Sequence, residues 1–368
     1  MSGLRIAVLG VGMMGAFHVE TLSNRIHGAQ ITVINDFLAE KAEQVATQVA
    51  ARVVGDPIEA INDPDIDAVL IATPGAAHEA QVNACLDRSI PVLCEKPLTT
   101  DVPSAYAIAQ KEKAIGKRLV QVGFQRRFDA EYAALKKLIT SGDLGNPLML
   151  HCTHRNPAVG DHFTSEFMIR DSVVHEVDVA RFLLDEELTS VQVIRGLSTS
   201  SAPPGTSDPM LVIFETESGR IVTDEIYVRT QVAYEVRTEV IGEKGSAFIG
   251  LDQNLLVKSS DGRWGGQITP NFIERFGAAY QTELQRWVDA ARKGTIDGPG
   301  SWDGFAAVAV CEAGVQALHS GQKVQVRLDG GLNAPPRPIV GDGGQPDWRL
   351  DEDAEPDIHA PDLIGDRP

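Results

Sequence analysis

Three ionisable side chains in two short motifs have the types and spacing that alcohol chemistry needs. Lys96 lies in the tripeptide Glu95-Lys96-Pro97, and Asp171-Ser172-Val173-Val174-His175 follows further along the chain. A lysine can stabilise a developing alkoxide, and a histidine can remove a hydroxyl proton near neutral pH. On a helix Asp171 and His175 share one face, so the aspartate can orient the imidazole or contact a bound hydroxyl itself. The three side chains predict proton abstraction from a secondary alcohol.

The same Asp–His pair has two other interpretations. It could simply complete a hydrogen-bond network on the otherwise apolar helix predicted at residues 165–184. It could also ligate a metal, but a metal needs more ligands and Glu176 points away from His175 on a helix, so no metal is predicted. The presence of Lys96 in the same chain favours chemistry over a structural pair.

A glycine-rich segment near the N-terminus predicts the site of a dinucleotide. An apolar run at residues 5–9 is typical of a buried parallel strand, and it leads into Gly10-Val11-Gly12-Met13-Met14-Gly15 and a predicted helix at 16–23. The first glycine permits the tight turn, the second lets the backbone approach a pyrophosphate, and the third lets helix and strand pack closely. Backbone N–H groups of this segment, Met13 and Met14 included, are expected to face the phosphates.

Asp36 predicts which dinucleotide binds. It ends the next apolar strand, residues 30–36, about twenty residues after the glycines, where a carboxylate accepts hydrogen bonds from the adenosine ribose. A carboxylate there repels a 2′-phosphate, and Phe37, Leu38 and Ala39 supply no compensating arginine. We therefore expect NAD rather than NADP. The alternative, a solvated aspartate at a strand end, is disfavoured by the complete strand–glycine–helix context.

The predicted first sheet places Lys96 at the cofactor. Further buried strands are predicted at residues 68–74, 91–97 and 118–124. The carboxyl ends of all these strands lie at one edge of a parallel sheet, and ligands bind at that edge. Lys96 ends one of the strands and is therefore expected beside the cofactor.

The pattern of the chain changes near residue 124. Strands follow at close spacing at residues 148–155, 191–194, 210–215, 220–227 and 234–241, and helices are predicted at 130–140, 272–293 and 304–320. The fold class is therefore α/β, with a Rossmann dinucleotide-binding domain at residues 1–123. An α+β domain for substrate binding and oligomerisation, with a large open, mainly antiparallel sheet, follows at residues 124–330. Residues 331–368 are predicted to be a flexible acidic tail rich in proline and glycine.

Composition excludes several function classes. The formal net charge of -18 repels nucleic acid and anionic membranes, so neither is expected as a partner. The chain has no long uncharged apolar run and no signal-peptide pattern, so no membrane span and no export are predicted. Its 4 cysteines are widely spaced and are expected to be free thiols in a cytoplasmic protein.

These motifs together carry a family resemblance. The glycine fingerprint, Glu95-Lys96-Pro97 and Asp171-x-x-x-His175 resemble the glucose–fructose oxidoreductase / inositol dehydrogenase (Gfo/Idh/MocA) family over about residues 4–330. The segments that are similar to its bacterial inositol 2-dehydrogenase subgroup are Phe124-Gln125-Arg126-Arg127-Phe128-Asp129, His151-Cys152-Thr153-His154-Arg155-Asn156-Pro157-Ala158-Val159-Gly160-Asp161 and Ile226-Tyr227.

The resemblance implies roles for matching positions. Lys96 contacts the reacting hydroxyl and the nicotinamide ribose, while Asp171 and His175 bind hydroxyls with His175 as the base. The further residues implied at the cofactor are Thr73, His78 and Glu95, and those implied at the substrate are Asn156, Tyr234 and Arg126. Each substrate residue has a plainer interpretation as well. Asn156 could be a turn residue, and Tyr234 could be an ordinary strand aromatic. Arg126 could pair with Asp129, as Arg127 could. His18 is interpreted as a packing residue, and His154 and His162 are not assigned.

The resemblance also implies a reaction. It is the NAD-dependent oxidation of a cyclic polyol, myo-inositol to 2-keto-myo-inositol (scyllo-inosose), by a homotetramer in inositol catabolism. Phe272 stands where a tryptophan is expected in the subgroup, which leaves other inositol isomers and pyranose sugars open as substrates. An NAD-dependent glycosidase is a second class, which release of NADH would distinguish. A redox-silent NAD sensor is a third, and it has no need of Lys96, Asp171 and His175 together.

Overall fold

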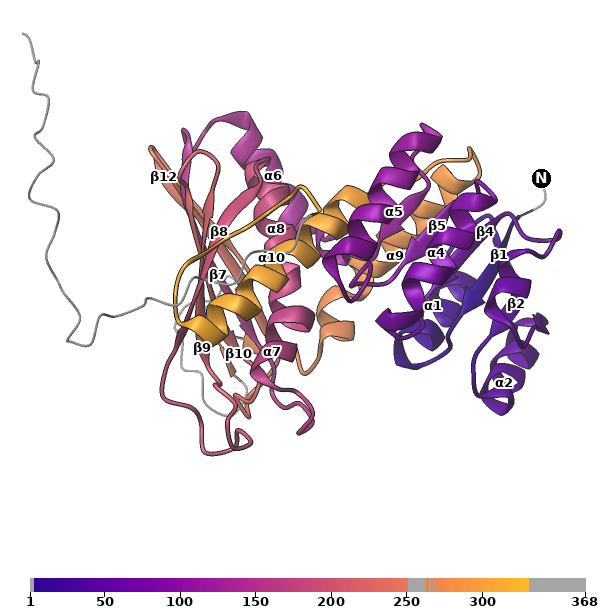
Figure 1. Cartoon of the computed structure of the whole chain (residues 1–368), viewed down its shortest axis with the longest axis horizontal. Helices are drawn as coiled ribbons and strands as arrows, with labels where there is room; N and C mark the ends of the chain where they lie inside the picture. The colour runs from indigo at the N-terminus through magenta and orange to yellow at the C-terminus, as the bar shows by residue number, and fades with distance from the viewer. Residues whose placement is uncertain (1–2, 251–262, 265, 268, 331–368) are drawn as a thin grey trace, which may run out of the picture. The chain divides into compact units, whose positions relative to one another are not determined.

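The computed structural model describes residues 3–250, 263–264, 266–267 and 269–330. The described residues all belong to one compact unit. The predicted acidic tail, 331–368, lies outside the described residues. Within the compact unit, two large sheets and their flanking helices position the predicted site (Figure 1).

The N-terminal sheet is parallel and has six strands in the order β3-β2-β1-β4-β5-β6. Its strands are β1 Leu4–Leu9, β2 Ala29–Asn35, β3 Arg52–Val53, β4 Ala68–Ile71, β5 Val92–Cys94 and β6 Val120–Val122. The chain moves outward from β1 to one edge and then returns to continue from β4 to the other. The strand order therefore reverses between β1 and β4, and the crevice at their carboxyl ends is where a dinucleotide binds in such sheets. The five predicted strands are confirmed.

Both faces of this sheet are covered by helices. The helices that alternate with its strands are α1 Met13–Asn24, α2 Ala39–Val49, α3 Pro57–Ile61, η1 Gly75–Ala77, α4 His78–Asp87 and α5 Val102–Ile115. A further helix, α9 Phe272–Ala291, comes from the far end of the chain (Figure 1). Its Leu284 and Trp287 are fully buried in one cluster with Leu70 and Leu93 of the sheet. The C-terminal part of the chain thus completes the core of the N-terminal sheet. The helices α1 and α9 were predicted from the sequence, whereas α2, α3 and α5 were not.

The second sheet has seven strands in the order β12-β11-β7-β10-β9-β8-β15. They are β7 Pro147–Arg155, β8 Leu188–Arg195, β9 Met210–Thr216, β10 Ile221–Tyr227, β11 Glu235–Gly242, β12 Gly245–Ile249 and β15 Val324–Gln325. Every neighbouring pair is antiparallel except β7 and β10, which run parallel. The predicted open, mainly antiparallel sheet is confirmed, with this one parallel pair as a difference. A small hairpin joins β13 Arg263–Trp264 to β14 Gly266–Gln267.

Three helices pack on one face of the second sheet (Figure 1). They are α6 Ala130–Ser141, α8 Val174–Leu184 and α10 Ser301–Ser320, with the short η2 Gln125–Phe128 leading into α6. On the opposite face, the neighbouring residues Ile194 and Leu211 are 44% and 37% exposed. Ile221 on β10 is 38% exposed on that same face. One face of the sheet is thus buried in the core, and the other remains open.

The helix predicted at residues 165–184 changes its winding midway. It begins as α7 Ser165–Phe167, continues as the π-helix η3 Met168–Val173, and becomes α8 at Val174. A π-helix closes i→i+5 hydrogen bonds, whereas the predicted α-helix closes i→i+4 bonds. Asp171 therefore lies in a π-helical segment, and His175 stands in the first turn of α8. Single π turns inside helices frequently mark functional sites.

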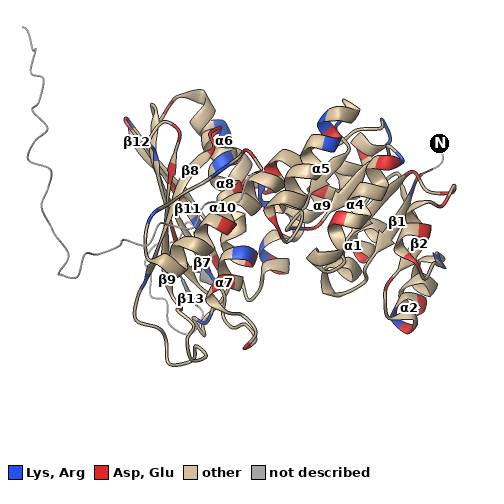
Figure 2. Ribbon diagram, viewed as in Figure 1, with Lys and Arg blue, Asp and Glu red and all other residues tan. Residues whose placement is uncertain are grey.

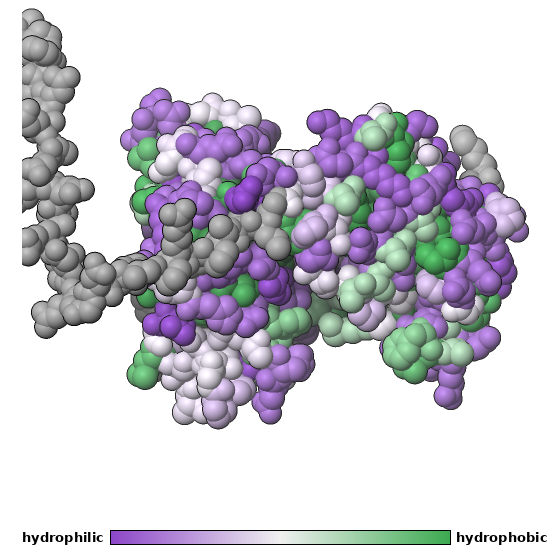
Figure 3. Space-filling view, in the orientation of Figure 1, coloured by the Kyte–Doolittle hydropathy of each residue, from purple (hydrophilic) through white to green (hydrophobic). Residues whose placement is uncertain are grey.

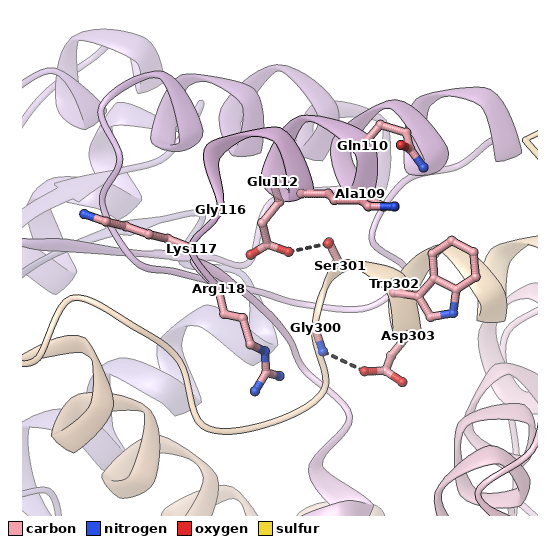
Figure 4. A pocket seen from close by; sticks show the side chains of 11 residues that line it. Ala109, Gln110, Glu112, Gly116, Lys117, Arg118, Gly300, Ser301, Trp302 and Asp303 are labelled. Carbon is pink, nitrogen blue, oxygen red and sulfur yellow. Dashed lines mark hydrogen bonds between the residues drawn. The ribbon is translucent and has the colours of Figure 1, made fainter.

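A surface pocket of about 390 Å³ lies between the end of α5 and the start of α10 (Figure 4). Its buried carboxylate, Glu112, accepts hydrogen bonds from the backbone N–H groups of Leu119 at 2.5 Å and Val120 at 2.7 Å, and also from the Ser301 hydroxyl. At the first turn of α10, the Gly300 N–H donates to Asp303 at 2.8 Å. These bonds fasten α10 to the N-terminal sheet, so the pocket is explained by the packing of the two helices.

In the view shown, neither charges of one sign nor apolar side chains are concentrated in one region of the described surface. Acidic and basic side chains are interspersed along the described helices and loops (Figure 2). Hydrophilic residues dominate the described surface, with scattered apolar patches between them (Figure 3). Among the described helices, none combines the length and apolar character needed to cross a lipid bilayer.

Candidate active site

The glycine loop between β1 and α1 has the geometry that a dinucleotide requires. Gly10 has a φ of +82°, which only glycine adopts readily. A Cβ on Gly15 would stand 1.9 Å from the Gly10 carbonyl oxygen, so only glycine permits this approach of helix and strand. A Cβ on Gly12, in contrast, would meet no described atom within 4 Å. The fold therefore explains the first and third glycines, and the space at the second is left for a ligand. Met13, 67% exposed, and Met14 lie in the first turn of α1.

This difference predicts opposite outcomes for two glycine substitutions. Gly15→Ala is expected to lower the free energy of unfolding by roughly 1–3 kcal/mol or more, because its methyl group overlaps backbone. Gly12→Ala, whose added Cβ meets no described atom within 4 Å, is expected to unfold within about 0.5 kcal/mol of the parent. It should nevertheless bind NADH at least about tenfold more weakly, because the methyl group occupies the phosphate position. Urea unfolding and NADH fluorescence titration measure both effects. Unchanged NADH binding by Gly12→Ala would contradict the assignment.

Asp36 follows β2 at the same edge and is buried. Its Oδ2 accepts a hydrogen bond from the Val11 N–H at 2.7 Å, and its Oδ1 accepts one from the Leu38 N–H at 2.9 Å. Each carboxylate oxygen retains a second lone pair for a ribose hydroxyl. Asp36 thus connects the glycine loop to the end of β2, with its carboxylate at the position where the adenosine ribose is expected.

Thr73 and His78 hold the loops after β4 and β5 together. The two ring nitrogens of His78 lie 2.8 Å from the Thr73 carbonyl oxygen and 2.8 Å from the Pro97 carbonyl oxygen. The Thr73 hydroxyl donates to Gln81 at 2.7 Å. His78 is 1% exposed, so the structure gives it a place beneath the cofactor edge, where it connects two loops.

Lys96 reaches from the end of β5 to the π-helix of the second part of the chain. Its Nζ donates to Asp171 Oδ1 at 2.7 Å and to the Asp171 carbonyl oxygen at 3.0 Å. The Lys96 and Asp171 side chains are 18% and 35% exposed, so both remain accessible to a ligand. The structure thus brings together two of the three residues with which the sequence analysis began, across the boundary between the two sheets.

His175 stands at the first turn of α8, close enough to Lys96 to respond to its charge. Burial holds the pKa of the His175 imidazole well below its usual range, and the positive charges of Arg126, Lys96 and His154 lower the same pKa further. Its Nδ1 is buried and has no hydrogen-bond partner among the described residues. His175 is therefore neutral near pH 7, which is the form that can accept a proton.

Asp171 does not orient His175. Its carboxylate is bonded to Lys96, and no hydrogen bond joins it to the imidazole. The geometry agrees instead with the other interpretation, a carboxylate placed to contact a bound hydroxyl.

Arg126 lies behind the site and is 1% exposed. Its guanidinium forms an ion pair with Glu176, and its Nη2 lies 3.3 Å from Nδ1 of His154. The other oxygen of Glu176 is 3.2 Å from the same Nδ1. Arg126 therefore reaches the substrate region through His154, and the interpretation that pairs it with Asp129 is wrong.

Arg127 does not pair with Asp129 either. Arg127 pairs with Asp178 at 2.6 Å and with Asp303 at 2.9 Å. Asp129 instead accepts a hydrogen bond from Arg275 at 2.9 Å. All these partners are distant in sequence, which is why the sequence did not reveal them.

His154, unassigned from the sequence, lies among the predicted substrate residues. Its ring centroid is 6.3 Å from that of His175 and 5.8 Å from that of Tyr234, which meets it edge to face. Tyr234 in turn meets Phe272 at 6.3 Å. The position of His154 on β7, two residues before Asn156 and so on the same face of the sheet, was the signal that could have identified it.

Asn156 follows β7 and begins a turn. Its backbone N–H donates to the Tyr227 carbonyl at 3.0 Å, and its carbonyl accepts from the Thr230 N–H at 3.0 Å. Its Oδ1 is buried without a hydrogen-bond partner among the described residues. The backbone thus makes the turn contacts, and the amide oxygen is left to meet another polar group.

Asp224 on β10 is a buried acid behind this network. Both of its carboxylate oxygens have no hydrogen-bond partner among the described residues. Burial raises its pKa well above the usual range, and the negative charge of Glu176 raises it further. Asp224 is therefore protonated in the folded protein at pH values where it is ionised in the unfolded chain.

This pKa shift predicts how Asp224→Asn changes stability with pH. The folded protein binds more protons here than the unfolded chain, so Asp224 makes stability fall as pH rises from its ordinary pKa toward its raised one. Asparagine lacks this effect. Between pH 5 and pH 8, the free energy of unfolding of Asp224→Asn is therefore expected to rise relative to the parent by at least about 1 kcal/mol. Urea unfolding at each pH tests this, with the exposed Asp143→Asn as control. A constant difference would contradict it.

A parallel dinucleotide-binding sheet, with a lysine, an aspartate and a neutral histidine at its carboxyl edge, defines a nicotinamide-dependent dehydrogenase of alcohols. Residues 4–124 match the model of the oxidoreductase family, NAD-binding Rossmann fold, and residues 136–326 match its C-terminal alpha/beta domain. The chain belongs to this Gfo/Idh/MocA oxidoreductase family. It is an NAD-dependent oxidoreductase that acts on CH–OH groups.

Individual relatives cover almost the whole described chain. Inositol 2-dehydrogenase from Rhodococcus erythropolis is 60% identical over 331 residues, which are 88% of this chain and 96% of the relative. Inositol 2-dehydrogenase 2 from Mycolicibacterium vanbaalenii is 58% identical, over 89% of this chain and 96% of the relative. The solved myo-inositol dehydrogenase from Lactobacillus casei, in complex with NAD(H) and myo-inositol, is 33% identical with a TM-score of 0.83, over 88% of this chain and 97% of that one.

Proposed function

We propose that this protein oxidises myo-inositol to 2-keto-myo-inositol with NAD. The single observation that carries the proposal is the contact of Lys96 with Asp171, beside a neutral His175, at the cofactor edge. Relatives that are 58–60% identical are inositol 2-dehydrogenases, and the Lactobacillus casei structure contains both NAD(H) and myo-inositol. The site residues that follow are part of this proposal.

The chemistry is divided among the three side chains. The glycine loop and Asp36 would hold NAD, which would supply the acceptor for the hydride of the carbinol carbon. The neutral imidazole of His175 removes the hydroxyl proton. The ammonium group of Lys96 donates a hydrogen bond to the oxygen on which negative charge develops. The carboxylate of Asp171 holds Lys96 at 2.7 Å and accepts a hydrogen bond from a neighbouring ring hydroxyl. The products are a ketone, NADH and a proton that leaves through His175.

The residues around this group set which hydroxyl is oxidised. Asn156 offers an amide oxygen that has no partner among the described residues. His154 on β7 offers a ring nitrogen, and Tyr234, just before β11, offers a hydroxyl group. A cyclic polyol with the right stereochemistry pairs with these groups, whereas an epimer leaves some of them buried and unpaired. Phe272 beside Tyr234 has no hydrogen-bond donor, so myo-inositol, another inositol isomer and a pyranose sugar have to be compared directly.

The proposal is tested by the absorbance of NADH in a substrate panel. Purified protein is given NAD or NADP with myo-, scyllo- or D-chiro-inositol, glucose or xylose. Fast reduction of NAD by myo-inositol supports the proposal. Turnover of another polyol alone would change the proposed substrate but not the proposed reaction. Cleavage of a nitrophenyl glycoside without net NADH formation would instead identify an NAD-dependent glycosidase, and no reaction with any substrate would favour a redox-silent sensor.

We also propose a homotetramer that acts in inositol catabolism in the cytoplasm, with domain boundaries at residues 123/124 and 330/331. The open face of the second sheet supports assembly, because Ile194, Leu211 and Ile221 lie on it partly exposed. Light scattering after size-exclusion chromatography measures the mass of the assembly against the 39.6 kDa chain. A monomer mass at micromolar concentration would overturn this part of the proposal.

A further inference from the structure

His18 lies on the helix that faces the cofactor phosphates and is fully buried. Its Nε2 is 2.7 Å from Oε1 of Glu95, a residue 77 positions away in the sequence. The sequence analysis interpreted His18 as a packing residue. It does pack, since the Tyr280 ring of α9 meets it edge to face at 5.8 Å, but packing does not require a hydrogen bond to a buried carboxylate.

Glu95 also contacts the backbone of the catalytic lysine. Its second oxygen, Oε2, accepts the backbone N–H of Lys96 at 3.2 Å. The carboxylate is buried, and a Cβ on Gly123 of the neighbouring strand end would stand 3.0 Å from Oε2. His18, Glu95 and the Lys96 backbone therefore form a continuous connection from α1 to the turn that carries Lys96.

The contact of His18 with Glu95 is a hydrogen bond between ring nitrogen Nε2 and a carboxylate oxygen, and Nε2 is the donor when that oxygen accepts. Nδ1 of His18 is buried and has no partner among the described residues.

The topology determines which half of the cofactor this connection serves. Asp36 on β2 lies on one side of β1 and faces the adenosine ribose, whereas β5 with Lys96 lies on the other side, beyond β4. The pyrophosphate at the start of α1 lies between the two. His18 therefore connects the phosphate-binding helix to the nicotinamide side and not to the adenosine side.

We propose that His18 is a positioning residue that, through Glu95, holds the Lys96 turn at a fixed place relative to the phosphate-binding helix. Lys96 and the nicotinamide are thereby kept in the separation that the reaction needs, and misplacement by about 1 Å can cost a hundredfold in rate. The inference rests on the proposed dehydrogenase function, but its first test needs no substrate.

The test compares His18→Leu, which keeps the volume but cannot donate, with His18→Gln, whose amide N–H replaces the Nε2–H donor. Dissociation constants are measured for NADH and for ADP-ribose, which lacks the nicotinamide. His18→Leu is expected to weaken NADH binding roughly tenfold and ADP-ribose binding less than about twofold. His18→Gln should restore NADH binding to within about threefold of the parent. Equal weakening of both ligands, or no weakening of either, overturns the proposal.

A second measurement uses whichever polyol the protein turns over. His18→Leu is expected to lower kcat at saturating NAD by roughly ten- to a hundredfold, with rescue by His18→Gln. Phe17→Leu is the matched control, because it disturbs the same aromatic contacts of α1 with Tyr280 and leaves the hydrogen bond intact. If Phe17→Leu lowers kcat as much at equal loss of thermal stability, packing explains the effect and the proposal fails. If no polyol is oxidised, the proposed function fails while the binding comparison still decides the role of His18.

Discussion

Replacing Lys96 with methionine is expected to lower kcat by roughly a thousandfold, while NADH binding weakens far less. The Lys96 ammonium group lies 2.7 Å from Asp171 and is partly exposed, so it can move its hydrogen bonds to a substrate oxygen as charge develops there. Methionine keeps the length of the side chain and removes both the charge and the donors. The loss should appear in kcat rather than in the KM for NAD, because the interaction is strongest in the transition state.

The Lys96→Met experiment needs a control for the loss of any lysine ion pair. Lys111 forms a comparable pair, 2.6 Å from Asp87, on the outer side of α5. Lys111→Met is expected to keep kcat within about twofold of the parent, because exposed ion pairs contribute little. A Lys96→Met enzyme with more than about a tenth of the parent kcat would contradict the role of Lys96 in stabilising the alkoxide.

Replacing His175 with glutamine is expected to lower kcat/KM by roughly a hundred- to ten-thousandfold and to change its pH dependence. Because burial and nearby positive charges hold the pKa of His175 well below its usual range, the imidazole stays neutral down to mildly acid pH. Protonation abolishes its function as a base, so the activity of the parent should fall as pH decreases through this low pKa. Above it, His175 should cause no further change.

The pH profile distinguishes a base from a residue that only shapes the pocket. In the parent, protonation of His175 makes kcat/KM fall at acid pH. In His175→Gln this fall, the acid limb of the pH profile, should disappear. His151→Gln serves as the control, since His151 lies on the opposite face of the second sheet, with its Nδ1 2.8 Å from the Thr223 hydroxyl. An acid limb that persists unchanged in His175→Gln would show that another group is the base.

The first sheet and its ligand edge could be predicted because their signals are local. The alternation of apolar strands and helices from residue 4 onward determines a parallel sheet, and parallel strands place their carboxyl ends together. Gly10, Gly12 and Gly15 could be assigned separate roles since each role is a backbone requirement of its own turn. The helices α2 and α5, which alternate with the strands of this sheet, were not predicted.

The arrangement of the second part was harder to predict. Five strands were placed correctly by their alternating pattern, but β7 and β10 pair in parallel, which neither strand's sequence indicates. The π-helix likewise carries no distinct local pattern, and Asp171 within it bonds to Lys96 and not to His175. Arg126 was assigned to the substrate on its motif, yet it lies behind His154 and is paired with Glu176.

The amino-acid sequence by itself determined the class of fold, the NAD-binding edge, and the presence of a lysine, an aspartate and a histidine suited to alcohol oxidation. Those conclusions depend on spacing along the chain and on backbone rules that act over a few residues. Only the tertiary structure decided which ionisable groups meet: Lys96 with Asp171, Arg126 with Glu176, and His18 with Glu95. The chain has 33 basic and 51 acidic residues, and many pairings are chemically equivalent in sequence. Packing selects among them, because burial makes an unpaired charge costly and thus favours the pairs that the fold can bring together.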